Sequence, residues 1–365
     1  MKRISLIFLI ISAIFTSCEN GKWEFPDYDT SAVYFAYQTP VRTITLGTDD
    51  VNDNTLDNQH KCQIMATVAG FREIKNDIEI SFRVENSLCN GLDNVTAMPS
   101  NYYSLSDNKM VISKGSKMIG GVTVTLTDAF FADPLALTTN YVIPLIMTDV
   151  KNADGILTGE AAVENPNRFI PEDWVAAPKD YILFAVKYLN PYDVIYLRRG
   201  TDNYVEDGVP RTEERKGPYA TPEGDEVIRL SSISMTEIAF PVDNFRANNV
   251  NLNMAFKLTF DPATNKCTFA NGAWKDSQLV NEYAGENFKV YDIVISGSGE
   301  YVKGGAKNSW GNKDRDILNL NYQVEYKVEQ PIGSDPKTVK CQTADGLVFR
   351  DRGVAIETFE PELKP

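Results

Sequence analysis

Fifty acidic residues and a single histidine limit the chemistry open to this chain of 365 residues. A single histidine, His60, argues strongly against a histidine-rich zinc site and, less strongly, against a histidine-based catalytic triad. A glycosidase needs two carboxylates on opposite sides of the scissile bond, roughly 5–9.5 Å apart, and so many acidic residues single out no pair. The sequence therefore predicts a protein that is not an enzyme, with no metal site and no cofactor.

An acidic loop formed by Asp49, Asp50 and Asp53 suggests calcium at first sight. An EF-hand that began at Asp50 would need glycine at its sixth position and a bidentate glutamate at its twelfth. The twelfth position is Lys61 and the sixth is not glycine. A solvated turn is the better interpretation.

Four glycines, at positions 297, 299, 304 and 305, follow a predicted strand over residues 289–296. A phosphate-binding loop would need a helix to begin after them, and the surrounding pattern is that of strands. We therefore interpret these glycines as turn residues that end the strand.

Trp274 and Trp310 lie in polar, glycine-containing segments at residues 271–275 and 308–312. Indole rings offer flat faces on which sugar rings can stack, and the neighbouring asparagines could bind sugar hydroxyls. The alternative is that each indole folds back onto the core as a lid. The two tryptophans are the candidate glycan-binding residues.

The first 18 residues have the pattern of a lipoprotein signal peptide. Lys2 and Arg3 precede an apolar run over residues 4–15, about half of the roughly 20 residues that span a bilayer. The run ends in Phe15-Thr16-Ser17-Cys18, which predicts lipid attachment at Cys18. The alternative is an ordinary secretory signal with a cysteine nearby by chance. Residues 19–30 would form a flexible tether.

The chain is strongly acidic, with 36 Lys and Arg against 50 Asp and Glu. Removal of the signal peptide takes away Lys2 and Arg3, leaving 34 against 50, a net charge of −16. Such a surface argues against nucleic acid, which needs basic stripes, and against docking to anionic headgroups. Cys62, Cys89, Cys267 and Cys341 could pair in three ways or remain free thiols.

Apolar residues alternate with polar ones along most of the chain, which predicts an all-β fold. The clearest strands lie at residues 78–84, 122–126 and 318–328. Residues 256–260 and 267–269 flank a turn-forming segment and predict a hairpin. The strand pattern is interrupted at residues 164–178, which divides the mature chain into domains at residues 31–165 and 175–365.

Several segments of the first domain resemble an N-terminal domain of unknown function found on Bacteroidetes surface lipoproteins. These segments are residues 31–36, 40–47, 98–105, 126–137 and 141–145. The resemblance implies an immunoglobulin-like β-sandwich.

The second domain is similar to the C-terminal partner of that domain, through residues 177–181, 187–192, 196–200 and 318–326. This resemblance implies a lipocalin-like β-barrel or a curved sandwich. Such lipoproteins accompany a TonB-dependent transporter and its partner surface lipoprotein in polysaccharide uptake. The resemblance therefore implies a non-catalytic protein that binds a poly- or oligosaccharide at the surface of the outer membrane. The alternatives are an adhesin or pilus-associated lipoprotein that binds proteins, and a surface glycan hydrolase.

Overall fold

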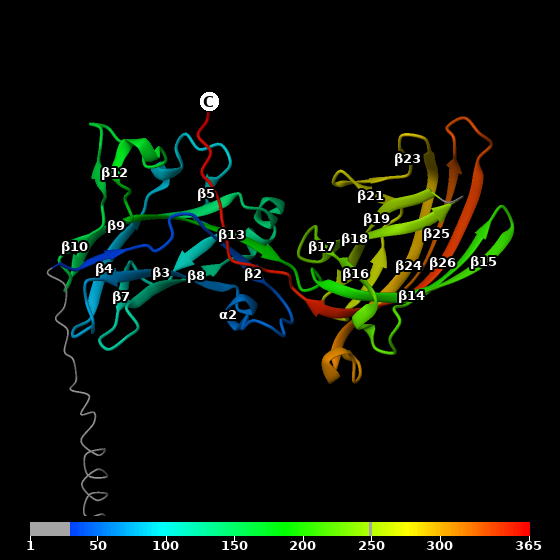
Figure 1. Ribbon diagram of the computed structural model, residues 1–365, viewed down its shortest axis with the longest axis horizontal. Coiled ribbons are helices and arrows are strands. Elements are labelled where there is room, and N and C mark those ends of the chain that lie inside the picture. The colour runs from blue at the N-terminus through cyan, green and yellow to red at the C-terminus, as the bar shows by residue number, and fades with distance from the viewer. Residues whose placement is uncertain (1–29, 248–249) are drawn as a thin grey trace, which may run out of the picture.

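The computed structural model describes residues 30–247 and 250–365, which form two β-domains side by side (Figure 1). The predicted all-β fold is confirmed. The α-helices of the described residues are single turns, α2 (Thr55–Asn58) and α3 (Asp128–Phe131). Among these residues no helix is long and apolar enough to cross a membrane. The predicted signal peptide, Cys18 and nearly all of the tether lie outside the described residues.

The N-terminal domain is a single sheet that folds over on itself into a sandwich. Its strands follow the order β10-β1-β3-β8-β7-β4-β9-β13-β2-β27, with β5 and β6 at the side. Their bounds are β1 (Ala32–Tyr34), β2 (Pro40–Thr45), β3 (Lys61–Ala69), β4 (Ile78–Val84), β5 (Thr96–Ala97), β6 (Tyr103–Leu105), β7 (Lys109–Ile112), β8 (Ile119–Leu126), β9 (Tyr141–Lys151), β10 (Gly155–Ile156), β13 (Tyr181–Leu189) and β27 (Glu357–Thr358). Inward residues of β3 and β8 share one core with those of β4, β9 and β13, as the sandwich prediction requires.

Strand β13 lies in the N-terminal sheet, whereas the sequence pattern places it in the second domain. It pairs with β9 on one side and with β2 on the other. Ile182 and Phe184 enter the sandwich core, and Leu183 enters a smaller cluster on the opposite face. Because both faces are covered, the strand is a continuous apolar run, and such a run does not indicate which sheet it joins. A small ribbon of β11 (Glu160–Ala161) and β12 (Trp174–Ala176) precedes it.

The C-terminal domain is one strongly curved antiparallel sheet, a half-barrel in Figure 1. Its path is β15-β14-β26-β25-β24-β20-β19-β18-β17, with β16 and β23 at the side. The bounds are β14 (Ile195–Glu206), β15 (Val209–Arg215), β16 (Glu226–Arg229), β17 (Ser231–Ser232), β18 (Glu237–Ala247), β19 (Val250–Asp261), β20 (Lys266–Phe269), β23 (Tyr283–Ala284), β24 (Lys289–Ala306), β25 (Arg315–Glu329) and β26 (Lys337–Asp351). A separate hairpin joins β21 (Ala273–Lys275) and β22 (Gln278–Val280).

Alternation along β25 produces the two faces of this half-barrel. Leu318, Leu320 and Tyr322 are buried in the core, and Asn319 and Asn321 are exposed on the other face. The predicted strand and the hairpin of β19 and β20 are both confirmed.

Gly297 and Gly299 do not end a strand, so their interpretation as turn residues is wrong. Both lie inside β24, which continues to Ala306. A Cβ atom at Gly297 would lie 2.4 Å from Cβ of Tyr322, and one at Gly299 would lie 2.4 Å from Cδ2 of Leu320. These glycines therefore allow β25 to approach closely, which is the usual reason for glycine inside a strand.

The two domains are joined by a buried arginine. Arg352 follows β26 and is 1% exposed. Its Nε donates to the carbonyl of Thr48 at 2.8 Å, and Nη1 donates to the carbonyls of Asn190 at 3.1 Å and Asp193 at 2.8 Å. Nη2 donates to the carbonyl of Leu46. The chain then returns to the N-terminal domain, where β27 pairs with β2. We call Arg352 and its four carbonyl partners the arginine clasp.

All four cysteines among the described residues are free thiols. Cys62, Cys267 and Cys341 are buried, and Cys89 is partly exposed. Burial raises the pKa of each of the three buried thiols to about 12.

Candidate functional site

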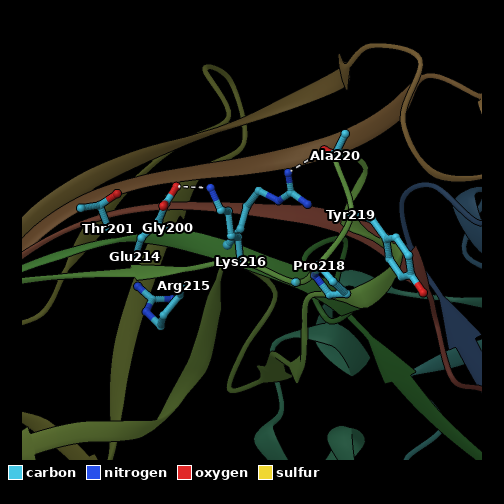
Figure 2. A pocket seen from close by; sticks show the side chains of 10 residues that line it. Gly200, Thr201, Glu214, Arg215, Lys216, Pro218, Tyr219 and Ala220 are labelled. Atoms are coloured by element: carbon cyan, nitrogen blue, oxygen red, sulfur yellow. Dashed lines mark hydrogen bonds and ion pairs between the residues drawn. The ribbon is translucent and has the colours of Figure 1, made fainter.

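A hollow of about 580 Å³ lies beside the hairpin of β14 and β15 (Figure 2). Its lining includes Arg199 and Thr201 on β14, Glu214 on β15, and Lys216 and Tyr219 on the segment that follows. Tyr219 is 61% exposed and lies at the opposite end of the labelled group from Thr201. We call this hollow the hairpin pocket.

The segment over the hairpin pocket is anchored by Arg199. Its Nε and Nη2 donate to the two carboxylate oxygens of Asp225, at 2.5 Å and 3.0 Å, and its Nη1 donates to the carbonyl of Ala220 at 2.9 Å. The same carboxylate accepts the backbone N–H of Gly217 at 2.7 Å. A bidentate pair fixes the distance and the relative plane of its two groups. Through Gly217 and Ala220 these bonds hold the backbone on both sides of Tyr219, whose ring remains exposed.

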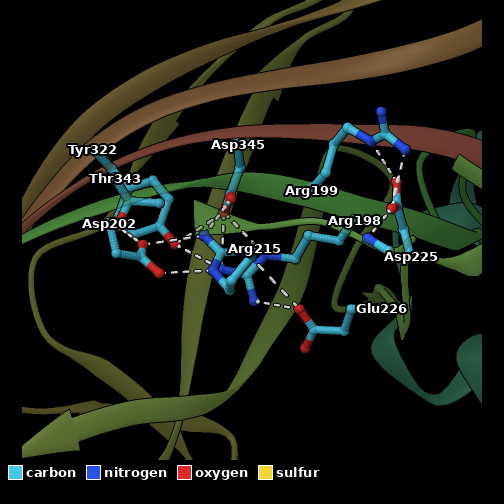
Figure 3. Close-up of polar contacts among 10 residues, drawn as sticks. Arg198, Arg199, Asp202, Arg215, Asp225, Glu226, Tyr322, Thr343 and Asp345 are labelled. Carbon is cyan, nitrogen blue, oxygen red and sulfur yellow. Dashed lines mark hydrogen bonds and ion pairs between the residues drawn. The ribbon is translucent and has the colours of Figure 1, made fainter. Parts of the chain in front are cut away.

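A buried ionic network supports the hairpin on the inner side of the sheet (Figure 3). Asp345 on β26 accepts from Nη2 of Arg198 at 2.8 Å and from Nη2 of Arg215 at 2.6 Å. Arg215 also donates from Nε to Asp202 at 2.6 Å, and Thr343 donates its hydroxyl to the same carboxylate at 2.7 Å. The network therefore ties β15, β14 and β26 together at one level.

The network determines the protonation of its members. Burial alone would lower the pKa of Arg215, but the hydrogen bond to Asp202 and the charge of Asp345 more than offset burial, so this pKa is raised. Burial raises the pKa of Tyr322 well above its ordinary value, and the charge of Asp345 adds to the shift. Tyr322 therefore stays a neutral phenol and donates to Asp345 at 3.2 Å.

Gly200 makes room for this network. A Cβ atom there would lie 2.2 Å from Oδ1 of Asp345 and 2.4 Å from the carbonyl of Ala344. Gly200 is directly opposite both Arg215 and Asp345 in the strand register. The absence of a side chain therefore lets the Asp345 carboxylate approach β14 closely.

The hairpin pocket presents hydrogen-bonding groups whose charges are largely compensated. Arg199 and Arg215 are paired with buried carboxylates, and Lys216 pairs with Glu214 at 3.0 Å. The Lys216–Glu214 pair is exposed and therefore weakly held, so either side chain can turn to a ligand. Glu214 is the only carboxylate among the residues that line the pocket. The arrangement suits a neutral polyhydroxylated ligand better than acid–base cleavage by two carboxylates.

A second polar hollow of about 330 Å³ continues along the same outward face of β14. Two rows of uncharged side chains cross the sheet here. One joins Asn203, Gln342, Gln323 and Ser296 on four neighbouring strands, and the next joins Thr201, Ala344, Asn321 and Ser298. Amide side chains both donate and accept, as paired hydroxyls require. We call these rows the amide band.

The two candidate tryptophans do not share a surface. Trp274 lies on β21, and Trp310 lies in the turn η5 (Trp310–Asn312). Figure 1 shows β21 and the orange loop that contains η5 at opposite ends of the half-barrel.

The two indoles also differ in their surroundings. The Trp310 ring is covered on one face by the guanidinium of Arg315, 3.6 Å from the ring centroid, and its Nε1 donates to the carbonyl of Phe349 at 2.8 Å. Arg315 in turn pairs with Asp50 at 2.6 Å. Trp274 is partly exposed, with the ammonium of Lys257 at 5.7 Å from its ring.

The acidic loop is a turn whose carboxylates bind within the protein. Asp49 accepts the backbone N–H groups of Val51 and Asn52, and Asp53 accepts that of Thr55. Within the described residues, no group of three or more acidic, cysteine or histidine side chains could hold a metal ion.

Neither the hairpin pocket nor the amide band is among the sites predicted from the sequence. Tyr219 was detectable in principle, because the segment 216–224 around it contains two prolines and two glycines and reads as a loop. The amide band had no comparable signal, since its members lie on strands far apart in the sequence.

Comparisons with known proteins identify the class. A family model described as a domain of unknown function, DUF5627, matches residues 191–353, and a model described as an N-terminal domain matches residues 28–154. The chain is 36% identical, with a TM-score of 0.76, to a Bacteroides ovatus protein of unknown function, over 92% of this chain and 100% of that one. The chain therefore belongs to the same family of two-domain β-proteins as this Bacteroides ovatus protein.

Two other solved structures are similar at much lower identity. One is described as an auxiliary nutrient binding protein from Bacteroides thetaiotaomicron, at 14% identity and a TM-score of 0.32, over 87% of this chain and 95% of that one. The other is described as a candidate carbohydrate binding protein from Bacteroides ovatus, at 12% identity and a TM-score of 0.26, over 92% of this chain and 100% of that one. The search of curated proteins finds no significant match.

Proposed function

We propose that the protein binds a poly- or oligosaccharide without cleaving it, along the hairpin pocket and the amide band. The observation that carries this proposal is the exposed ring of Tyr219 at one end of the hairpin pocket and the uncharged side chains of the amide band, which begins at Thr201, at the other end. An aromatic face and planar amides together match the two surfaces of a sugar, its C–H face and its hydroxyl edges.

In this proposal Cys18 carries the lipid, and the protein is displayed at the surface of the outer membrane. It would concentrate the glycan for a TonB-dependent transporter and that transporter's partner surface lipoprotein. Two acyl signals are enough for stable anchoring, and a lipobox cysteine supplies them. Protease shaving of intact cells tests the display, and a Cys18→Ala variant that remains in the membrane fraction would contradict the anchor.

The alternatives receive less support from the described residues. A hydrolase would need a second carboxylate facing Glu214, but Glu214 is the sole carboxylate among the residues that line the pocket. One edge that an adhesin could extend is β15, whose sequence Val-Pro-Arg-Thr-Glu-Glu-Arg places proline and four charges on that edge. Such residues protect an edge strand from pairing.

Affinity electrophoresis of the fragment from Glu19 onward against a panel of polysaccharides is the first test, followed by calorimetry with the retained polymer. Tyr219→Ala should weaken binding about tenfold, the loss of about 1.4 kcal/mol for one aromatic contact. Tyr37→Ala is the matched control, because Tyr37 is 62% exposed but lies on the other domain. Equal affinity of both variants and the wild type would refute the hairpin pocket as the site.

A double variant, Gln323→Ala and Gln342→Ala, tests the amide band in the same assay. Trp274→Ala tests the tryptophan prediction, which the partly exposed ring keeps open. If Trp274→Ala abolishes retention and Tyr219→Ala does not, the glycan site lies at the hairpin of β21 and β22 instead.

A further inference from the structure

A separate hollow of about 280 Å³ lies at the junction of the two domains, and no acidic residue lines it. The N-terminal domain contributes His60 and Asn58, and the C-terminal domain contributes Met235, Asn265 and Lys303. Domain junctions are preferred places for small-molecule sites. In a chain with 50 acidic residues, a hollow that is lined by none of them but by Lys303 and His60 favours anions over cations.

Six of the twelve residues that line this junction pocket form its apolar walls. They are Leu46, Pro191, Met235, Pro262 and the tyrosines at positions 192 and 301. The ring of Tyr192 stacks on Phe260 with centroids 3.6 Å apart and planes at 11°. Tyr301 donates its hydroxyl to Asp316 at 2.7 Å. The arginine clasp fixes the two domains at the same place, because it binds the carbonyl of Leu46.

Two basic side chains at the junction pocket have no ion-pair or side-chain hydrogen-bond partner within the part of the chain that the structure describes. The Lys303 ammonium has no ion pair there, and the ring nitrogens of His60 have no hydrogen bond. The His60 ring packs on Phe131 with centroids 4.3 Å apart, which fixes its plane.

The carboxylates close by in sequence are already bound. Asp50 pairs with Arg315 at 2.6 Å, and Asp316 accepts from Tyr301 and from the backbone N–H of Gly304. The His60 imidazole and the Lys303 ammonium, one from each domain, are therefore available to an anion.

We propose that the junction pocket binds a small carboxylate with an apolar ring, the carboxylate at His60 and Lys303 and the ring against the apolar walls. This site is independent of the proposed glycan site, which lies on the outward face of β14. A volume of about 280 Å³ is near the lower end of ligand pockets, roughly 300–1,000 Å³, and fits a single ring.

Calorimetry of the fragment from Glu19 onward tests the proposal with benzoate and cyclohexanecarboxylate as probes. A protein labelled with ¹³C at its methionine methyl groups reports the place, since Met235 lines the pocket. Both probes should bind and shift the Met235 signal. Benzamide, which has the same shape and no charge, should bind roughly tenfold more weakly because it lacks a charge-assisted hydrogen bond.

Lys303→Met should weaken benzoate binding roughly tenfold, and Lys313→Met, an exposed lysine outside the pocket, should leave it unchanged. His60→Asn should also weaken binding while keeping the backbone, since His60 has φ 58° and asparagine tolerates that conformation. Three outcomes would overturn the proposal: no Met235 shift at millimolar benzoate, equal binding of benzoate and benzamide, or tighter binding of galacturonate than of benzoate.

Discussion

Replacing Arg352 by methionine should separate the two domains. Methionine keeps much of the apolar stem and removes every donor of the arginine clasp. Four backbone carbonyls, two on each side of the junction, would lose their partner. Each buried carbonyl left without a partner costs about 1–3 kcal/mol, although solvent that enters the gap recovers part of this.

The guanidinium itself is costly to bury, which reduces the net effect. Burial lowers the pKa of Arg352, and no carboxylate hydrogen-bonds to its guanidinium among the described residues. Removing a desolvated charge regains several kcal/mol. We therefore expect a net loss of about 3 kcal/mol in the free energy of unfolding, a large part of the 5–15 kcal/mol typical of a domain.

Urea titration measures this loss, and small-angle X-ray scattering measures the spread of distances between the domains. The matched control is Arg350→Met, two residues earlier, because the Arg350 side chain is 45% exposed. Arg350→Met should change neither quantity. If Arg352→Met unfolds within about 1 kcal/mol of the wild type and scatters identically, the clasp does not hold the junction, and the argument from its four hydrogen bonds is refuted.

Two further predictions concern the buried groups of the fold. Gly200→Ala should destabilise the C-terminal domain by about 1–3 kcal/mol in a urea titration, because its Cβ would lie 2.2 Å from the Asp345 carboxylate. Gly155→Ala is the control and should leave stability unchanged, because a Cβ there has no atom within 4 Å. Equal effects of the two variants would show that β14 and Asp345 do not need a glycine between them. Burial raises the pKa of Cys62, Cys267 and Cys341 to about 12. In the unfolded chain a thiol has a pKa of about 8.5. The contribution of these thiols to the free energy of unfolding is therefore complete below about pH 8.5 and is lost as the pH rises toward 12. Unfolding titrations at pH 8 and pH 10.5 should therefore show a lower free energy of unfolding at the higher pH, and a serine variant at the buried Cys62 should show a smaller pH dependence.

Period-two alternation was sufficient to predict the strands with one solvated face. It located β4, β8 and β25 because each has an apolar and a polar side. It could not assign β13 to a sheet, since both faces of β13 are buried and the pattern carries no information about neighbours.

The buried charges were not predictable for a different reason. Arg198 and Asp345 are 147 positions apart, and the alternation rule places each on the inner face without naming its partner. Only the pairing of β14 with β26 brings them to one level. The same holds for Arg352, whose partners are backbone carbonyls of residues at 46, 48, 190 and 193 and therefore leave no side-chain signal.

The ligand chemistry of the outward face depends on strand register in the same way. Gln323 is opposite Gln342, and the next outward pair along these strands is Glu325 opposite Lys340. A slip of one residue would turn the amides inward, whereas a slip of two would keep them outward and set Gln323 opposite Lys340. A neutral sugar would then meet an ammonium in place of an amide. The buried network on the inner face of the sheet opposes any such slip, because it would separate Tyr322 on β25 from its acceptor Asp345 on β26. The costly buried charges therefore preserve the alignment of the uncharged side chains that the proposed glycan site requires.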